Sequence, residues 1–202
     1  KTFRIIDTLS EINPSLHWMF TTNAQWSLDE KMKLSLNKII LKVVHFSLDS
    51  FSPETYSKIR KKGELDYALN TIQEMIQFRD NNYQHCPFTI LTSITVQQLN
   101  AREVPFFIKK SLEFGSKPFV QYLHEPRGLS LNALPELEKI ELIEYYFSLM
   151  CDSELFIADE LMKTLIYQLT IIDRKKYLMK YIFSIQRHLD QKLEELEGTN
   201  LL

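Results

Sequence analysis

Glycine, cysteine and long apolar runs are scarce in this 202-residue chain, and each scarcity excludes a class of protein. With 4 glycines the chain contains neither a G-x-G-x-x-G nor a Walker pattern, which excludes the usual phosphate-binding loops. The two isolated cysteines, Cys86 and Cys151, argue against a disulfide framework, lack C-x2-C metal spacing and suit a reducing cytoplasm. No apolar run approaches the ~20 residues of a membrane span. We therefore expect a cytoplasmic protein with no membrane partner.

An excess of charge of either sign is also missing. The chain has 24 Lys and Arg against 26 Asp and Glu, a net charge of -2. This balance lacks the basic footprint of nucleic-acid binding, so no nucleic-acid partner is expected. What the chain does have is 45% hydrophobic and 25% charged residues, the composition of a globular protein with a real core.

Short apolar runs alternate with helical patterns in the first part of the chain. Four strands are expected, at residues 17–22, 41–46, 88–96 and 119–123. Amphipathic helical patterns lie before and between them, at residues 1–12, 27–38, 64–79 and 104–114. For the second helix, Ser27 is the expected N-cap with Glu30 as its capping-box partner. The right-handed crossover rule then predicts one curved parallel sheet with helices on its outer face.

From residue 127 onward the pattern is helical. After a loop at 127–133, helices are expected at 134–151, 153–172 and 173–197. The last helix has an apolar stripe at spacings of three and four, formed by Leu178, Ile182, Ile185, Leu189, Leu193 and Leu196. Such a stripe packs on the sheet or pairs with another chain, so helix-mediated self-association is one expected interaction. We divide the chain into a βα part, 1–126, and a helical C-terminal part, 127–202.

Residues 43–63 form the most informative stretch. Val43–Phe46 is an apolar run typical of a buried parallel strand, and it ends in the polar Ser47. Ser52 then suits an N-cap and Pro53 the first position of a helix. Ligands of α/β sheets bind at the carboxyl ends of the strands, so polar residues at this strand end are the first functional candidates.

The motifs in this stretch are Ser47-Leu48-Asp49 at the strand end, Pro53-Glu54-Thr55-Tyr56 at the helix start, and Ile59-Arg60 before Gly63. They resemble the fourth βα unit of the radical S-adenosylmethionine (radical SAM) enzymes. Neighbouring motifs resemble the same family in order: a strand end at 20–23, a fifth strand and helix start at 95–103, and a sixth strand at 119–126. The resemblance covers roughly residues 1–126. It implies an α/β fold, a partial (βα) TIM-like barrel with a curved parallel sheet followed by C-terminal helices.

Two features of that family are missing from these residues. The family holds a [4Fe–4S] cluster on three cysteines spaced C-x3-C-x2-C, and it carries a Gly-Gly-Glu-Pro at the end of the second strand. Both would precede Lys1, so we expect an N-terminally incomplete fragment, and a cluster only if an upstream segment supplies three cysteines. The five histidines show no H-x3-H spacing, so no metal ligand is predicted among the residues present.

Five residues are predicted to bind S-adenosylmethionine, each with a simpler alternative role. The resemblance implies that Ser47 bonds the amino acid end or the ribose, and that Arg60 clamps the carboxylate. It also implies cofactor contacts for Asp49, for Asn100 at a helix start, and for Leu123 at the adenine. The alternatives are a strand-end cap for Ser47, a helix-dipole partner for Asp49, a solvated side chain for Arg60 and a cap for Asn100.

Further candidates follow two other strand ends. By the same resemblance Thr21, Thr22 and Asn23 face the substrate; alternatively, they satisfy backbone groups of a turn. His124 and Glu125 are adjacent and suit an acid–base pair in a cleft, or a salt-linked loop.

The leading hypothesis is a radical SAM enzyme core whose residues bind, orient and shield S-adenosylmethionine for 5′-deoxyadenosyl radical chemistry on a small-molecule or peptide substrate. The alternative is a relative without a cluster, a scaffold or binding module acting through its C-terminal helices. An unrelated TIM-barrel enzyme would need catalytic carboxylates or lysines at strand ends, and Asp49 and Glu125 alone do not make that case.

Overall fold

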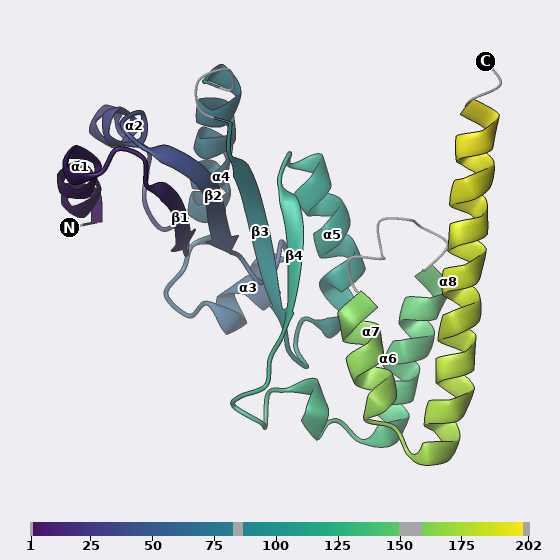
Figure 1. Cartoon of the computed structure of the whole chain (residues 1–202). Coiled ribbons are helices and arrows are strands. Elements are labelled where there is room, and N and C mark those ends of the chain that lie inside the picture. The colour runs from purple at the N-terminus through teal and green to yellow at the C-terminus, as the bar shows by residue number, and fades with distance from the viewer. Residues whose placement is uncertain (1, 83–86, 150–158, 200–202) are drawn as a thin grey trace. The chain divides into compact units, whose positions relative to one another are not determined.

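The structure is a computed structural model of the chain, and it describes residues 2–82, 87–149 and 159–199 (Figure 1). In chain order its elements are α1 (Thr2–Ile12), β1 (His17–Thr22), α2 (Glu30–Leu36), β2 (Ile40–Ser47), α3 (Pro53–Ile59), α4 (Leu65–Asn81), β3 (Thr89–Val96), η1 (Ala101–Glu103), α5 (Val104–Glu113), β4 (Lys117–Tyr122), η2 (Leu131–Ala133), α6 (Glu136–Leu149), α7 (Asp159–Tyr167) and α8 (Ile171–Thr199). The four predicted strands are therefore confirmed within a residue or two at each end.

The four strands form one parallel sheet in the order β1-β2-β3-β4, so the α/β class and the parallel sheet are confirmed. In its register Phe20 pairs with Val44, and Val44 with Ile90. The sheet is open, with β1 and β4 at its edges. Because neighbours in sequence are neighbours in the sheet and all strands run the same way, their carboxyl ends lie along one edge.

The chain divides into two compact units. The first comprises Lys1–Thr95 and Phe106–Phe119, which include α1 to α4 and most of α5. The second comprises Val96–Pro105 and Val120–Leu202, which include α6 to α8. The predicted division at residue 126 stays a prediction.

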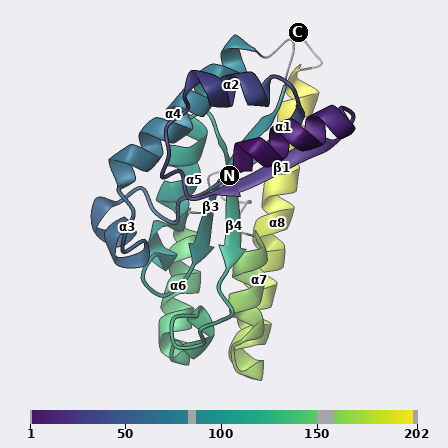
Figure 2. The same cartoon turned by 90° about the vertical axis from the view of Figure 1, so that its left-hand side faces the viewer.

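Strand alternation in the first unit determines which side chains meet the helices. Leu41, Val44 and Phe46 of β2 are buried, whereas the residues between them are partly exposed. In β3 the hydroxyl of Thr92 hydrogen-bonds the Oγ atoms of Ser111 and Ser116, at 2.7 and 2.8 Å, so this face of the strand carries α5. Figure 2 shows α4 and α5 on the same side of β3. The core of this unit therefore lies between the sheet and these helices.

The opposite face of the sheet is lined by the alternate residues. In β2 these are Val43, His45 and Ser47, all half-buried. The ring of Phe119 stands edge-on to the imidazole of His45, with 5.3 Å between the centroids. Burial lowers the pKa of His45, and its buried Nε2 atom has no hydrogen-bond partner among the described residues. The face that ends in Ser47 thus contains a neutral imidazole.

One predicted cap is wrong and one predicted helix start is confirmed. Helix α2 is capped by Asp29, whose Oδ1 accepts a hydrogen bond from the Met32 amide at 2.7 Å, and not by Ser27. A carboxylate at this position accepts from the first-turn N–H groups and complements the positive end of the helix dipole. At α3, Pro53 takes the first helical position as expected, although the side chain of Ser52 makes no capping bond.

In the second unit α8 packs through two buried tyrosines. Tyr177 stacks on Phe147 at 6.4 Å between centroids, and Tyr181 is also buried. Lys180 pairs with Glu144, which lowers the pKa of that carboxyl.

In the described part of the chain, no helix is both long and apolar enough to cross a bilayer.

The predicted apolar stripe of α8 is mostly exposed. Ile182, Leu189 and Leu193 are each at least half exposed, while Leu178 and Ile185 are half-buried. The side chain of Leu196, and residues 150–158 of the predicted helices, lie outside the part that the structure describes.

Candidate functional site

The chain makes a sharp, well-braced turn where β2 ends. The amides of Leu48 and Asp49 both donate to the carbonyl oxygen of Ser93, at 3.1 and 2.9 Å. Asp49 has a φ of 66°, in the left-handed region that Asp adopts more readily than most residues. The turn is thereby fixed against β3, and it aims the Asp49 side chain along the end of the sheet.

Asp49 joins three elements through its carboxylate. The side chain is 5% exposed. Its Oδ1 accepts from the Thr95 amide at 2.8 Å, and its Oδ2 accepts from Arg60 Nε at 2.8 Å and lies 2.7 Å from Arg60 Nη2. Arg60 is the C-cap residue of α3, so the carboxylate connects the ends of β2, β3 and α3.

Arg60 is partly buried and paired, but not all of its donors are used. Its side chain is 30% exposed, and Asp49 is its hydrogen-bond and ion-pair partner in the described residues. A guanidinium has five N–H donors, so Nη1 is left for a further acceptor. The ion pair holds this group in one orientation, which suits the binding of a carboxylate.

Ser47 has an unused hydroxyl. It is half-buried at the end of β2, opposite Ser93 in the register of the sheet. No described residue hydrogen-bonds its Oγ, so nothing in the described structure supports a purely structural cap. The structure thus joins Asp49 to Arg60, and Ser47 lies two residues before Asp49 in the same strand–turn–helix unit.

A glutamine that the sequence reasoning missed supports this unit from the β1 side. Gln25 donates from Nε2 to Tyr56 Oη at 3.2 Å and to the Glu64 carbonyl at 3.1 Å, and its Oε1 accepts from the Glu64 amide. A Cβ at position 63 would lie 2.8 Å from Tyr56 Oη, and this close approach favours glycine there. No sequence signal links Gln25 to Tyr56, because 31 residues separate them.

The three predicted substrate-facing residues divide into two kinds. Thr22 Oγ1 accepts from Trp26 Nε1 at 2.7 Å, and Asn23 Oδ1 accepts from the Gln25 amide at 3.2 Å. Both side chains therefore serve the loop after β1, the simpler of the two roles considered. Thr21 is exposed and lies opposite His45 in the sheet register, so it remains the candidate for a substrate contact.

Asn100 and Leu123 belong to the second unit. Asn100 is fully buried, and its Oδ1 accepts from the Gln97 amide at 2.8 Å, which makes it part of the turn after β3. The Leu123 amide donates to the Val96 carbonyl at 3.1 Å and continues the pairing of β3 with β4. Their predicted cofactor contacts stay predictions.

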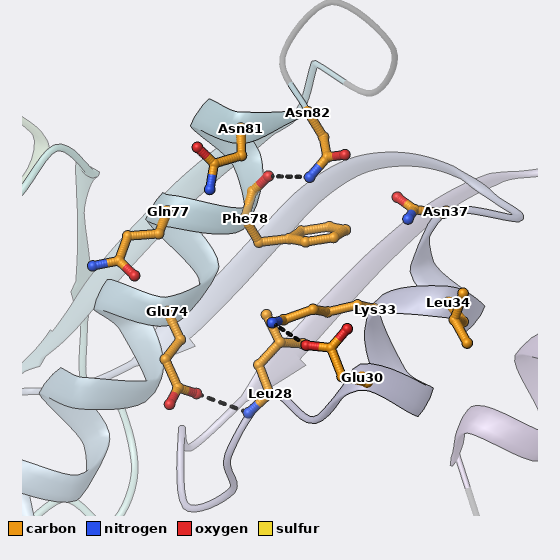
Figure 3. A pocket seen from close by; sticks show the side chains of 10 residues that line it. All are labelled: Leu28, Glu30, Lys33, Leu34, Asn37, Glu74, Gln77, Phe78, Asn81 and Asn82. Carbon is orange, nitrogen blue, oxygen red and sulfur yellow. Dashed lines mark hydrogen bonds and ion pairs between the residues drawn. The ribbon is translucent and has the colours of Figure 1, made fainter.

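A pocket of about 450 Å³ lies between α2 and α4 (Figure 3). Its polar groups are largely paired: Glu74 accepts from the Leu28 amide at 2.8 Å, and Lys33 bonds Glu30 at 2.7 Å. None of the predicted site residues lines it. We assign it no role.

A second hollow, of about 560 Å³, lies in the second unit and includes His124 and Glu125. The two side chains do not bond each other. Glu125 Oε2 accepts from the Arg127 amide at 2.8 Å, and His124 meets the edge of Tyr122 at 5.1 Å between centroids. The acid–base pair is therefore not assembled in this geometry.

Neither a metal site nor a protein family is identified for the described residues. Within residues 2–82, 87–149 and 159–199, no group of three or more His, Cys, Asp and Glu side chains is placed to hold a metal ion. Cys86 and Cys151 lie outside the described residues. Comparisons with protein-family models, curated proteins and solved structures return no match for this chain.

Proposed function

We propose that this chain is the S-adenosylmethionine-binding core of a radical SAM enzyme acting on a small-molecule or peptide substrate. One observation carries the proposal. At the carboxyl end of β2, a half-buried Ser47 hydroxyl without a partner among the described residues lies two residues from Asp49, which holds the Arg60 guanidinium and leaves its Nη1 unused. A hydroxyl and an oriented cation at a strand end are what a zwitterionic nucleoside needs.

Each residue has a distinct role in this proposal. Ser47 hydrogen-bonds the ribose or the amino acid end of the cofactor, and Arg60 Nη1 binds its carboxylate. Asp49 touches no ligand and positions Arg60. The bound cofactor supplies the hydrogen-abstraction chemistry; the chain binds it, orients it and excludes water. Two cysteines do not fit a three-cysteine cluster site, so no step of cluster chemistry is assigned to these residues.

The partial barrel is part of the same proposal. In it, the sheet face with His45, Ser47 and Phe119 is the inner, substrate-facing surface, and Thr21 lies on it beside His45. The neutral imidazole and the aromatic ring make this surface partly apolar, which suits a site that shields a reactive species from water.

Cofactor affinity of paired variants tests the site. In calorimetric titration with S-adenosylmethionine, Ser47→Ala and Arg60→Gln are expected to weaken binding about 10-fold or more, since hydrogen bonds to charged groups contribute ~1.5–3 kcal/mol. Ser57→Ala and Lys62→Gln, at exposed positions near the same helix, serve as matched controls and should bind normally. Normal affinity in both site variants would remove the site assignment.

Iron analysis tests the enzyme class separately. We expect protein from the whole open reading frame, reconstituted anaerobically, to hold about four irons and to release 5′-deoxyadenosine on reduction. Reconstituted protein without iron would contradict the radical enzyme and leave cofactor binding by Ser47 and Arg60 as a separate question.

A scaffold acting through α8 is the second candidate function, and the exposed apolar side chains of α8 favour it. Ile182, Phe183, Leu189 and Leu193 are 50–67% exposed. The charges of this helix are asymmetric: residues 171–185 have four Lys and Arg against one Asp, and residues 186–199 have two Lys and Arg against four Asp and Glu. Two antiparallel copies of α8 would set basic halves against acidic halves and cover the apolar side chains.

Sedimentation analysis of the chain tests this second candidate. A dimer is expected that Leu189→Lys converts to a monomer, while Gln191→Lys, an added charge at an exposed position two residues away, leaves it intact. A monomeric wild-type chain at high concentration would contradict the scaffold.

A further inference from the structure

The second unit contains a buried lysine without an acidic partner. Lys139, in the first turns of α6, is 8% exposed. Its Nζ donates to the Asn132 carbonyl at 3.0 Å, and no carboxylate of the described residues pairs with it. Burying an ammonium without a counter-charge is unfavourable, and one carbonyl satisfies only one of its three donors. The remaining donors need an acceptor from outside the described chain.

Lys139 lines the hollow of about 560 Å³, whose other lining residues are also polar: His124, Glu125, Arg127, Asn132 and Gln168. Arg127 is exposed, and its guanidinium has no partner among the described residues. Glu125 is the one carboxylate of the lining, and its Oε2 is used by the Arg127 amide. Two cationic side chains, Lys139 and Arg127, against one carboxylate make the lining of the hollow positive.

Hydrogen bonds fix the walls around Lys139. Tyr122 Oη donates to Asn132 Oδ1 at 2.6 Å and accepts from Gln168 Nε2 at 3.0 Å. Ser130, which is fully buried, accepts from the Asn132 amide at 3.2 Å. The carbonyl that holds Lys139 therefore sits on a braced loop, and the ammonium is presented at a fixed position.

The side-chain amide of Gln168 is a second polar group of this lining with an unpaired atom. The Oε1 atom of Gln168, another residue of the lining, is buried and has no hydrogen-bond partner among the described residues, while Nε2 of the same amide donates to Tyr122 Oη. Two residues of the same lining, Lys139 and Gln168, thus have hydrogen-bonding capacity that the described residues leave unfilled. A hydrogen phosphate or a carboxylate supplies the anionic oxygen that the Lys139 ammonium lacks.

We propose that this hollow binds the oxyanion of a small molecule, a phosphate or a carboxylate, through Lys139 and Arg127. The site shares no residue with the proposed cofactor site, so it stands or fails independently of S-adenosylmethionine binding. The hollow is lined by polar groups, so it recognises the head group of the ligand and not an apolar body.

Calorimetric titration of the chain with inorganic phosphate, at constant ionic strength against chloride, tests the site, and glycolate replaces phosphate in a second arm. We expect saturable binding of one or both anions that Lys139→Met weakens about 10-fold or more, since charge-assisted hydrogen bonds dominate it. Arg127→Gln, on an exposed loop, should weaken it as well without affecting folding. Lys175→Met, which removes an exposed lysine of α8, is the matched control and should bind as the wild type does.

The two titrations distinguish the possible ligands and can refute the site. A preference for phosphate or for glycolate identifies the source of the oxyanion. No saturation with either anion, or equal affinity in the wild type, Lys139→Met and Arg127→Gln, would overturn the proposal. If Lys139→Met does not fold, Arg127→Gln alone decides.

Discussion

The ion pair between Asp49 and Arg60 gives the sharpest prediction for this fold. Asp49→Asn keeps the Oδ1 acceptor for the Thr95 amide, and Asn tolerates the left-handed φ of 66°. The change therefore isolates the charge. It replaces the Oδ2 acceptor with an NH2 donor that faces the donors of Arg60.

The expected loss follows from the burial of the pair. Breaking a fully buried ion pair costs ~3–5 kcal/mol, but the Arg60 side chain is 30% exposed and partly screened by water. We therefore expect Asp49→Asn to lower the free energy of unfolding by ~2–3 kcal/mol. Urea unfolding followed by circular dichroism measures it, and an unchanged slope with urea concentration shows that stability alone has changed.

A double-mutant cycle with Arg60→Gln assigns that loss to the pair. We expect a coupling energy of ~1.5–2 kcal/mol between Asp49 and Arg60, since Nε and Nη2 of Arg60 both approach Oδ2 of Asp49. The exposed pair of Glu30 and Lys33 is the control and should couple far more weakly. A buried-pair coupling as weak as this control would refute the idea that the carboxylate joins β2, β3 and α3.

Three further changes test the first unit. Thr92→Val is expected to destabilise it by ~1–3 kcal/mol in urea unfolding, because the buried Ser111 and Ser116 hydroxyls lose their shared partner; unchanged stability would contradict the network. Ile72→Ala, at a fully buried position of α4, should lower the unfolding free energy by ~2–5 kcal/mol, and a loss below ~1 kcal/mol would show that α4 does not pack here. Burial lowers the pKa of His45 below 6.5, so the unfolded chain binds this proton first and stability falls as the pH drops through and below 6.5. His45→Gln should reduce the difference in stability between pH 7.5 and 5.5, and an unchanged difference would contradict the burial of a neutral imidazole.

The strands and their parallel arrangement were predictable because the signal is local. Runs such as Thr89–Val96 combine β-branched residues with turn residues at their ends, and helical spacing between the runs implies parallel crossovers. The cap of α2 was mispredicted because Ser27 and Asp29 both suit an N-cap, and only the geometry of the loop selects between them.

The candidate site was predictable only in part. Sequence position put Ser47 at a strand end, but it could not show that Asp49 uses its charge on Arg60, 11 residues away. Nor could it show that Thr22 and Asn23 serve their own loop, because that depends on the path of the backbone after β1.

The sequence by itself determined the α/β class, the parallel order of the strands and the residues at their carboxyl ends, since apolar periodicity acts over a few residues along the chain. Only the tertiary structure decided which charges are paired. It brings Lys139 of α6, Arg127 of a loop and Gln168 after α7 around one hollow, while it buries the Asp49 carboxylate against Arg60. Burial and pairing depend on groups that are distant in sequence, and no local pattern records them.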